Sequence, residues 1–141
     1  MMFYTHMIFS AFLYFLYLYI NNITFIFSHN QIINLLITLV FSLVSDIDSN
    51  NSKFGRKFIF SFLFKHRGIL HSIFPLIILY FTNFYAFLGY FSHLLLDALT
   101  KKGINPFNSK FKIKWIVSTN SILEKTLSFL IFLGLVYIIS I

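Results

Sequence analysis

The chain of 141 residues contains no cysteine and few charged side chains. The absence of cysteine excludes disulfides, iron–sulfur clusters and thiolate zinc sites, so any metal ion must be bound by imidazole and carboxylate groups. Charged residues make up 11% of the chain, against roughly 25% in an ordinary soluble domain. A soluble fold could not cover its surface with so few charges. Since 58% of the residues are hydrophobic, we expect a single domain, residues 1–141, inside a lipid bilayer.

The positive charges are unevenly distributed. Ten of the eleven Lys and Arg residues fall in two stretches: Lys53, Arg56, Lys57, Lys65 and Arg67, then Lys101, Lys102, Lys110, Lys112 and Lys114. Basic loops of membrane proteins remain in the cytoplasm, so both stretches are predicted to be cytoplasmic. We prefer this interpretation of the net charge of +7 to a nucleic-acid-binding surface.

Several apolar segments are long enough to cross a bilayer, which takes roughly 20 residues. They are Met1–Ile20, Ile23–Val44 and Ile122–Ile141. The first lacks a basic start and a small-residue cleavage site, which favours a retained anchor over a signal peptide. The sequence therefore predicts an all-α, polytopic protein of the inner (cytoplasmic) membrane.

A further apolar segment, Ile69–Leu99, is long for one crossing and short for two. Its most polar interior point is Thr82-Asn83, which we expect to form the turn of a helical hairpin. A hairpin places both basic loops on the same side of the membrane, as their charge requires. The prediction is then about five short transmembrane helices, with the N-terminus inside and the C-terminus outside.

In this topology the ionisable residues gather at the cytoplasmic end of the bundle. The chain has only four carboxylates, and they share that layer with four of the five histidines. The group comprises His6, Asp46, Asp48, His66, His71, His93, Asp97 and Glu124. His29 lies on the predicted outer side and is interpreted as incidental. We predict a metal site at the cytoplasmic end.

The spacing within the group supports metal binding but leaves alternatives open. His93 and Asp97 are four residues apart and therefore share one face of a helix, although Asp97 could simply orient His93. Asp46 and Asp48 would repel each other unless a cation lay between them; alternatively they cap or end a helix.

The segment from His66 to His71 is the most distinctive, because two imidazoles flank an arginine and a glycine. Imidazoles suit zinc, manganese or iron, and Arg67 can bind phosphate or carboxylate with its planar fork. The alternative is a basic turn at the membrane surface with incidental histidines. Glu124 could be a general base, a ligand or half of a surface pair with Lys125.

Taken together, these segments resemble the membrane-bound metal-dependent hydrolase family of YdjM-like inner-membrane proteins. The resemblance covers nearly the whole chain and ends at Glu124. It includes Thr5-His6, Ser45–Ser49, His66-Arg-Gly-Ile-Leu-His71-Ser72, Gly89–Thr100, Gly103 and Pro106. Ser45 and Leu70 depart from the proline and threonine expected at those positions. The resemblance implies a polytopic inner-membrane protein with a divalent-metal hydrolase site.

From these residues we predict hydrolysis of an ester or phosphoester of a membrane-associated, lipid-like substrate by metal-activated water. One or two divalent ions, zinc by preference and otherwise manganese or iron, would be bound by some of His6, Asp46, Asp48, His66, His71, His93 and Asp97. Glu124, or a carboxylate such as Asp48 that is not a ligand, would accept a proton. Arg67 would stabilise negative charge on an anionic substrate.

Two other interpretations stay open: a divalent-metal transporter or sensor, and a catalytically inactive family member. A transporter should place its ligands near mid-membrane, with paths to both faces. A lipid phosphatase is disfavoured, because Phe87 stands where that class has an arginine. Membrane lipids are the expected partners, and the oligomeric state is not predicted.

Overall fold

The computed structural model describes residues 1–24, 26, 28–44, 46, 71–107 and 112–140. The described part of the chain contains five α-helices and, apart from isolated bridges, no strand. The helices are α1 (Phe3–Ile20), α2 (His29–Val44), α3 (Ile73–Thr82), α4 (Phe84–Ala98) and α5 (Ile122–Ser140). The all-α prediction is confirmed for these residues.

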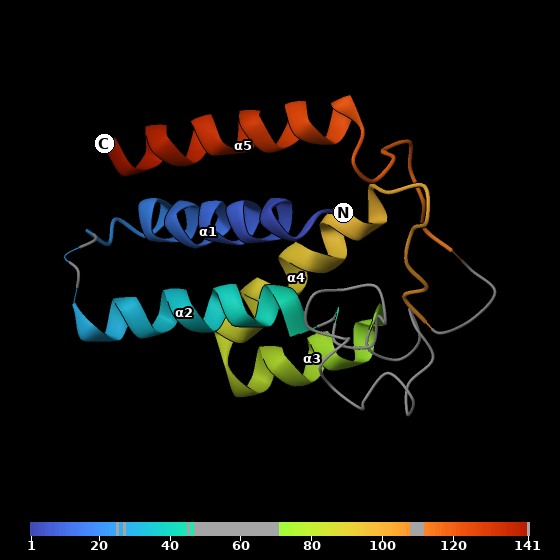
Figure 1. The fold of residues 1–141 in the computed structure, drawn as a ribbon. Coiled ribbons are helices and arrows are strands. Elements are labelled where there is room, and N and C mark those ends of the chain that lie inside the picture. Colours follow the sequence, from blue (N-terminus) through green and yellow to red (C-terminus); the bar gives the residue numbers. More distant parts are fainter. Residues whose placement is uncertain (25, 27, 45, 47–70, 108–111, 141) are drawn as a thin grey trace.

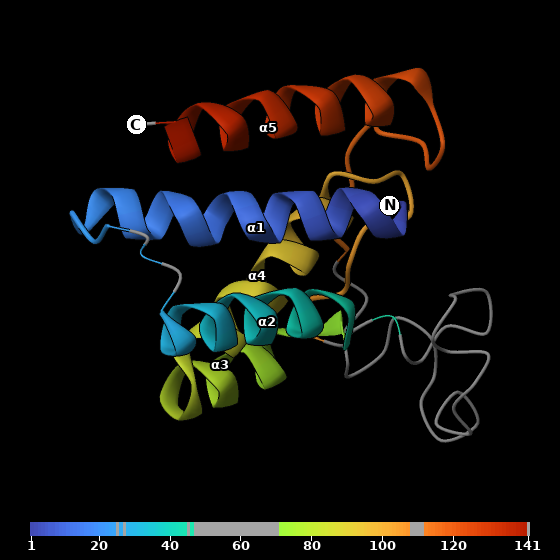
Figure 2. The same ribbon diagram turned by 60° about the vertical axis from the view of Figure 1, so that its left-hand side comes forward.

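The helices pack around α4. Helix α1 lies between α5 and α2 in both views, and α4 crosses behind them (Figures 1 and 2). Helix α4 contacts α1, α2 and α3, whereas α5 contacts α1. The N-terminus lies beside the C-terminal end of α4, and the C-terminus lies at the opposite end of the bundle (Figure 1). Helices from distant parts of the sequence therefore meet at one end of the bundle.

The predicted hairpin turn at Thr82-Asn83 is confirmed. Helix α3 ends at Thr82, and Asn83 is both the C-cap of α3 and the N-cap of α4. The Asn83 side chain accepts a hydrogen bond from the Ala86 backbone N–H at 2.9 Å, the usual chemistry of a helix N-cap. Ser72 caps the start of α3 in the same way, by accepting from Phe74.

The start of the second predicted span is wrong. The apolar pattern placed it at Ile23, but α2 begins at His29. The Gln31 side chain explains the shift, because it donates to the Thr24 carbonyl at 2.9 Å and accepts from the Ile26 backbone N–H at 2.9 Å. These bonds tie the Gln31 side chain to the backbone of Thr24 and Ile26, which lies outside the helix.

Two helices are long and apolar enough to cross a bilayer, α1 with 18 residues and α5 with 19. At 1.5 Å per residue they measure about 27–29 Å, close to the ~30 Å hydrocarbon layer. Helix α3 has 10 residues and is therefore only about 15 Å long. Crossing by all five helices stays a prediction. The outer side of α5 exposes Phe129, Leu130 and Val136, which suits contact with lipid.

Helices α2 and α4 approach each other closely at Gly89. A Cβ atom at Gly89 would lie 2.1 Å from the Thr38 carbonyl oxygen, much too close for any side chain. Ser42 on α2 and Ser92 on α4 are also fully buried. Small residues of this kind let helices in membranes pack backbone against backbone.

We expect Gly89→Ala to destabilise the protein by about 1–3 kcal/mol or more, because α2 must move away from α4. Thermal unfolding in detergent, followed by helical circular dichroism, measures this. Gly134→Ala is the matched control, because its Cβ would meet only the Phe12 ring, at 3.1 Å. Equal stability of Gly89→Ala and the wild type would contradict the close approach.

Candidate metal centre

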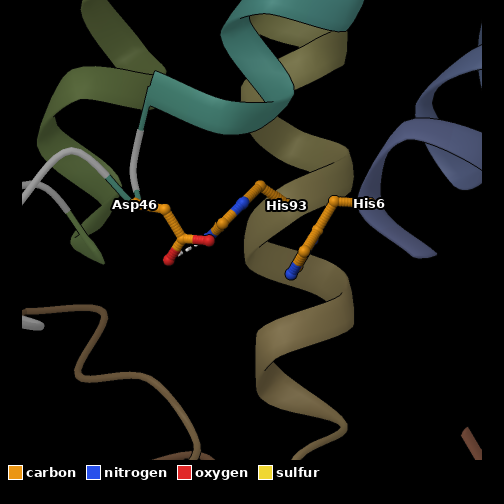
Figure 3. A group of neighbouring side chains, drawn as sticks. All are labelled: His6, Asp46 and His93. Atoms are coloured by element: carbon orange, nitrogen blue, oxygen red, sulfur yellow. Dashed lines mark ion pairs between the residues drawn. The ribbon is translucent and has the colours of Figure 1, made fainter. Parts of the chain in front are cut away.

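Five ionisable side chains from four helices meet at one end of the bundle. His6 lies near the start of α1, Asp46 just beyond α2, His71 just before α3, and His93 and Asp97 in the last turns of α4. The three imidazoles are fully buried, Asp97 is 2% exposed, and the Asp46 side chain is 29% exposed. Figure 3 shows His6 and His93 side by side, with Asp46 directed toward His93.

The donor atoms are separated by distances that suit ligands of one ion. His71 Nε2 lies 3.6 Å and His93 Nε2 3.7 Å from Asp97 Oδ2. His6 Nε2 lies 3.7 Å from Asp97 Oδ1, and His93 Nε2 lies 3.9 Å from Asp46 Oδ1. These distances are too long for direct hydrogen bonds. Two tetrahedral ligands of a zinc ion lie about 3.4 Å apart, given bond lengths of about 2.1 Å.

The orientation of His93 is set by the backbone of α2. Its Nδ1 lies 2.6 Å from the Ser42 carbonyl oxygen. Since a carbonyl oxygen can only accept, Nδ1 carries the proton and donates it. When the ring is neutral, its Nε2 is then unprotonated and faces the cluster, which is the arrangement seen in metal-binding histidines.

The His6 ring stacks on His93, with centroids 4.1 Å apart and an interplanar angle of 14°. Within the described part of the chain, both ring nitrogens of His6 and Nε2 of His93 are buried without a hydrogen-bond partner. Burying such groups without a partner costs about 1–3 kcal/mol each. A bound cation would satisfy nitrogen lone pairs of both rings, so the residues present fit a metal ion.

Two groups of three side chains have donor atoms within 4.8 Å of one another: His71, His93 and Asp97, all buried, and His6, Asp46 and His93. Asp97 also accepts a hydrogen bond at Oδ1 from the Met1 amino group, at 3.1 Å. Its Oδ2 atom is the one that faces His71 and His93.

Glu124 is buried beside this cluster and holds α5 against α1. Its Oε1 accepts hydrogen bonds from the Met2 backbone N–H and from the Thr5 hydroxyl, the latter at 3.1 Å. Its Oε2 accepts from the Asn120 backbone N–H at 2.6 Å. The Thr5 hydroxyl is also 3.0 Å from that of Ser128. Oε1 is thus bound to the N-terminal turn that carries His6, and Oε2 is bound to the backbone just before α5.

The sequence contained a signal for the local hydrogen bonds at the start of α5 that the prediction overlooked. Ser121 and Glu124 have the spacing of a capping box, in which a serine and a glutamate three residues later bind the first backbone N–H groups of a helix. The Ser121 hydroxyl indeed accepts from the Glu124 backbone N–H at 3.3 Å. Nothing in the sequence revealed that Thr5 would reach the same carboxylate.

The structure brings together His6, Asp46, His71, His93 and Asp97 as expected. His29 is exposed at the start of α2, at the other end of that helix from Asp46. The predicted site residues Asp48, His66 and Arg67 lie outside the described residues, as does the first basic stretch. Their roles stay predictions.

These features define an all-helical membrane protein with a buried histidine–carboxylate cluster at one end of its bundle. The chain belongs to the YdjM inner membrane protein family, whose model matches residues 1–141. The resemblance drawn from the motifs is thereby confirmed at the level of the family. The family and the two long apolar helices also support a location in the inner membrane. Searches of curated proteins and of solved structures find no match to the chain.

We expect Thr5→Val to lower the free energy of unfolding by about 1–3 kcal/mol, because it removes the hydroxyl that bonds buried Glu124. Thermal unfolding in detergent measures the change. Thr126→Val, at an exposed position of α5, is the control and should differ little from the wild type. If the two variants were equally stable, the hydrogen bond between Thr5 and Glu124 would not contribute to stability.

Proposed function

We propose that this chain is a membrane-embedded, metal-dependent hydrolase that cleaves an ester or phosphoester of a membrane-associated, lipid-like substrate. The observation that carries the proposal is the cluster of three buried imidazoles around Asp97, with donor atoms 3.6–3.7 Å apart. A buried carboxylate is costly in an apolar bundle, and so are the ring nitrogens of His6 and the Nε2 atom of His93, which are buried without a hydrogen-bond partner in the described part of the chain. A divalent cation compensates both.

His71, His93 and Asp97 are the residues that would hold the ion. They are the more buried group, and their Nε2–Oδ2 distances are shorter than the 3.9 Å between His93 and Asp46. Two imidazoles and one carboxylate are a ligand set typical of catalytic zinc, which leaves a position open. Manganese and iron also accept these ligands. Once bound, such an ion lowers the pKa of a coordinated water toward neutrality.

One ion per chain is favoured over two. Both candidate groups use His93, and its Nδ1 is committed to the Ser42 carbonyl. Nε2 has a single lone pair and can bind only one cation. The two groups are therefore alternatives.

Asp46 is the carboxylate best suited to accept a proton from water. It is more exposed than Asp97, and it lies within reach of His93. Glu124, the base first expected from the sequence, has both oxygens engaged in hydrogen bonds: Oε1 with the start of α1 and Oε2 with the Asn120 backbone before α5. We therefore assign proton transfer to Asp46 and a positioning role to Glu124. Asp48 stays a candidate base or ligand, His66 a candidate ligand, and Arg67 the candidate cation for substrate charge.

A site at the ends of the helices suits a substrate that arrives at the membrane surface. His6 is near the start of α1, and Asp97 is one residue from the end of α4. A transporter would require ligands near the middle of its helices. With the basic loops in the cytoplasm, this end of the bundle lies at the inner leaflet, and α3 and α4 form a hairpin that enters and leaves from that side.

We expect purified wild-type protein to bind about one zinc ion per chain, whereas His71→Ala and Asp97→Ala lose it, because each removes one of the three ligands. Elemental analysis after dialysis against zinc measures the stoichiometry. His29→Ala removes an exposed imidazole far along α2 from the cluster and should retain the ion. A metal-free wild type would overturn the proposal.

We expect Asp46→Asn to keep the bound ion but to slow hydrolysis by about 10²–10⁴-fold, because proton transfer is lost. Release of fatty acid or phosphate from a panel of ester and phosphoester lipids measures the rate. Loss of metal in this variant would make Asp46 a ligand instead. Uptake of zinc into proteoliposomes, without hydrolysis, would favour the transporter.

A further inference from the structure

The segment after α4, residues 99–117, folds back on itself beside the cluster. We call it the basic loop. The Lys101 backbone N–H donates to Val117 O at 3.0 Å, and the Trp115 N–H donates to Thr100 O at 3.1 Å. Ile104 and Ile113 exchange backbone hydrogen bonds of 2.8 and 3.0 Å. The described parts of the loop, 99–107 and 112–117, thus lie side by side.

Gly103 allows the two parts of the loop to approach each other closely. Its φ is +64°, in the left-handed region, and a Cβ there would lie 2.1 Å from the Ile113 carbonyl oxygen. Only glycine fits both constraints without strain. The basic loop therefore has a defined shape in its described parts.

The basic loop is attached to both helices that flank the proposed ion. The Thr100 hydroxyl donates to the Asp97 carbonyl at 2.7 Å. The Pro106 carbonyl accepts from the Ile73 backbone N–H at 2.8 Å, two residues after His71. A ligand bound to the loop would therefore lie near the end of α4, which carries Asp97, and near the start of α3, which His71 precedes.

The surface of the loop combines positive charge with exposed apolar side chains. Every charged residue between Asp97 and Glu124 is a lysine, and the described ones are exposed: Lys101, Lys102, Lys112 and Lys114. Trp115 and Ile116 are each 64% exposed and Phe107 is 58% exposed. Tryptophan prefers the interface between hydrocarbon and headgroups, and lysine is attracted to anionic headgroups. A soluble partner would leave unexplained why this surface lies at the end of an apolar bundle.

We propose that the basic loop is a docking surface for anionic phospholipid headgroups, with Trp115 and Ile116 entering the interface and the four exposed lysines binding lipid phosphates. The biological purpose of this docking rests on the proposed function, since a bound anionic phospholipid would be a phosphoester substrate held beside the ion. The docking itself requires neither metal nor catalysis.

The chain offers a direct probe, because Trp115 is its sole tryptophan. Full-length protein is reconstituted into nanodiscs of phosphatidylcholine alone or with added phosphatidylglycerol, and Trp115 emission and acrylamide quenching are measured with metal chelated. We expect a blue shift and weaker quenching when phosphatidylglycerol is present, and a reduced response at high salt because the charges are screened. Emission that is equal in the two lipid compositions would overturn the proposal.

Charge variants test which residues carry the binding. Joint substitution of Lys101, Lys102, Lys112 and Lys114 by glutamine should abolish the phosphatidylglycerol response. Lys114→Gln alone should weaken it about fivefold, as expected for one lysine at an anionic surface. Lys125→Gln, at an exposed position of α5 outside the loop, is the matched single-charge control and should respond like the wild type. An unchanged response in the fourfold variant would contradict the assignment.

The outcome is separable from that of the hydrolase proposal. If the purified protein binds no zinc and cleaves no lipid of the panel, yet its Trp115 emission responds to phosphatidylglycerol, hydrolysis is refuted and docking is supported. An active enzyme whose Trp115 emission ignores lipid charge refutes docking alone. If short DNA added in solution changes Trp115 emission as strongly as phosphatidylglycerol does, the surface recognises polyanions in general and the lipid assignment is wrong.

Discussion

The energetic constraint on which the site depends is the burial of Asp97 in an apolar bundle. A carboxylate in such surroundings must be neutralised or paired, because few solvent dipoles remain to stabilise its charge. Asp97 Oδ1 is paired with the Met1 amino group at 3.1 Å, and the Nε2 atoms of His6, His71 and His93 lie within 3.7 Å of its two oxygens. Each imidazole comes from a different part of the chain, so the cluster also ties α1, α3 and α4 together at one end.

Two contacts outside the cluster hold it in shape. Gly89 lets α4 lie against the backbone of α2, and one turn further along α4 the His93 ring donates to the Ser42 carbonyl. The helix contact therefore sets the direction in which Nε2 of His93 points. On the other side, Glu124 joins α5 to the turn that carries His6. Ligand geometry thus depends on helix packing several residues away.

Prediction from sequence succeeded where a local rule applied. The turn at Asn83 followed from a polar pair inside an apolar segment, and its side chain forms the expected cap. Sidedness predicted that the few ionisable residues would gather at one end of the bundle. His6, Asp46, His71, His93 and Asp97 do lie together there, whereas Asp48 and His66 lie outside the described residues. The start of α2 was missed because the Gln31 side chain bonds to the backbone of Thr24 and Ile26, and an apolar pattern gives no information about such a contact. The hydrogen bonds that join Glu124 to the start of α1 were not foreseen, and its role as a general base stays a prediction.

The sequence by itself determined the membrane environment, the helical class and the short list of groups able to bind a cation. Those properties depend on composition and on spacing along one helix. Only the tertiary structure decided that Asp97 is the shared neighbour of three imidazoles and that Nε2 of His93 faces the cluster. It also decided that the Glu124 carboxylate accepts hydrogen bonds from the start of α1. Such relations join residues as much as 122 positions apart, and they arise from how closely the helices pack. The distance between two helices depends on single small residues such as Gly89, so the spacing of residues along the chain does not predict it.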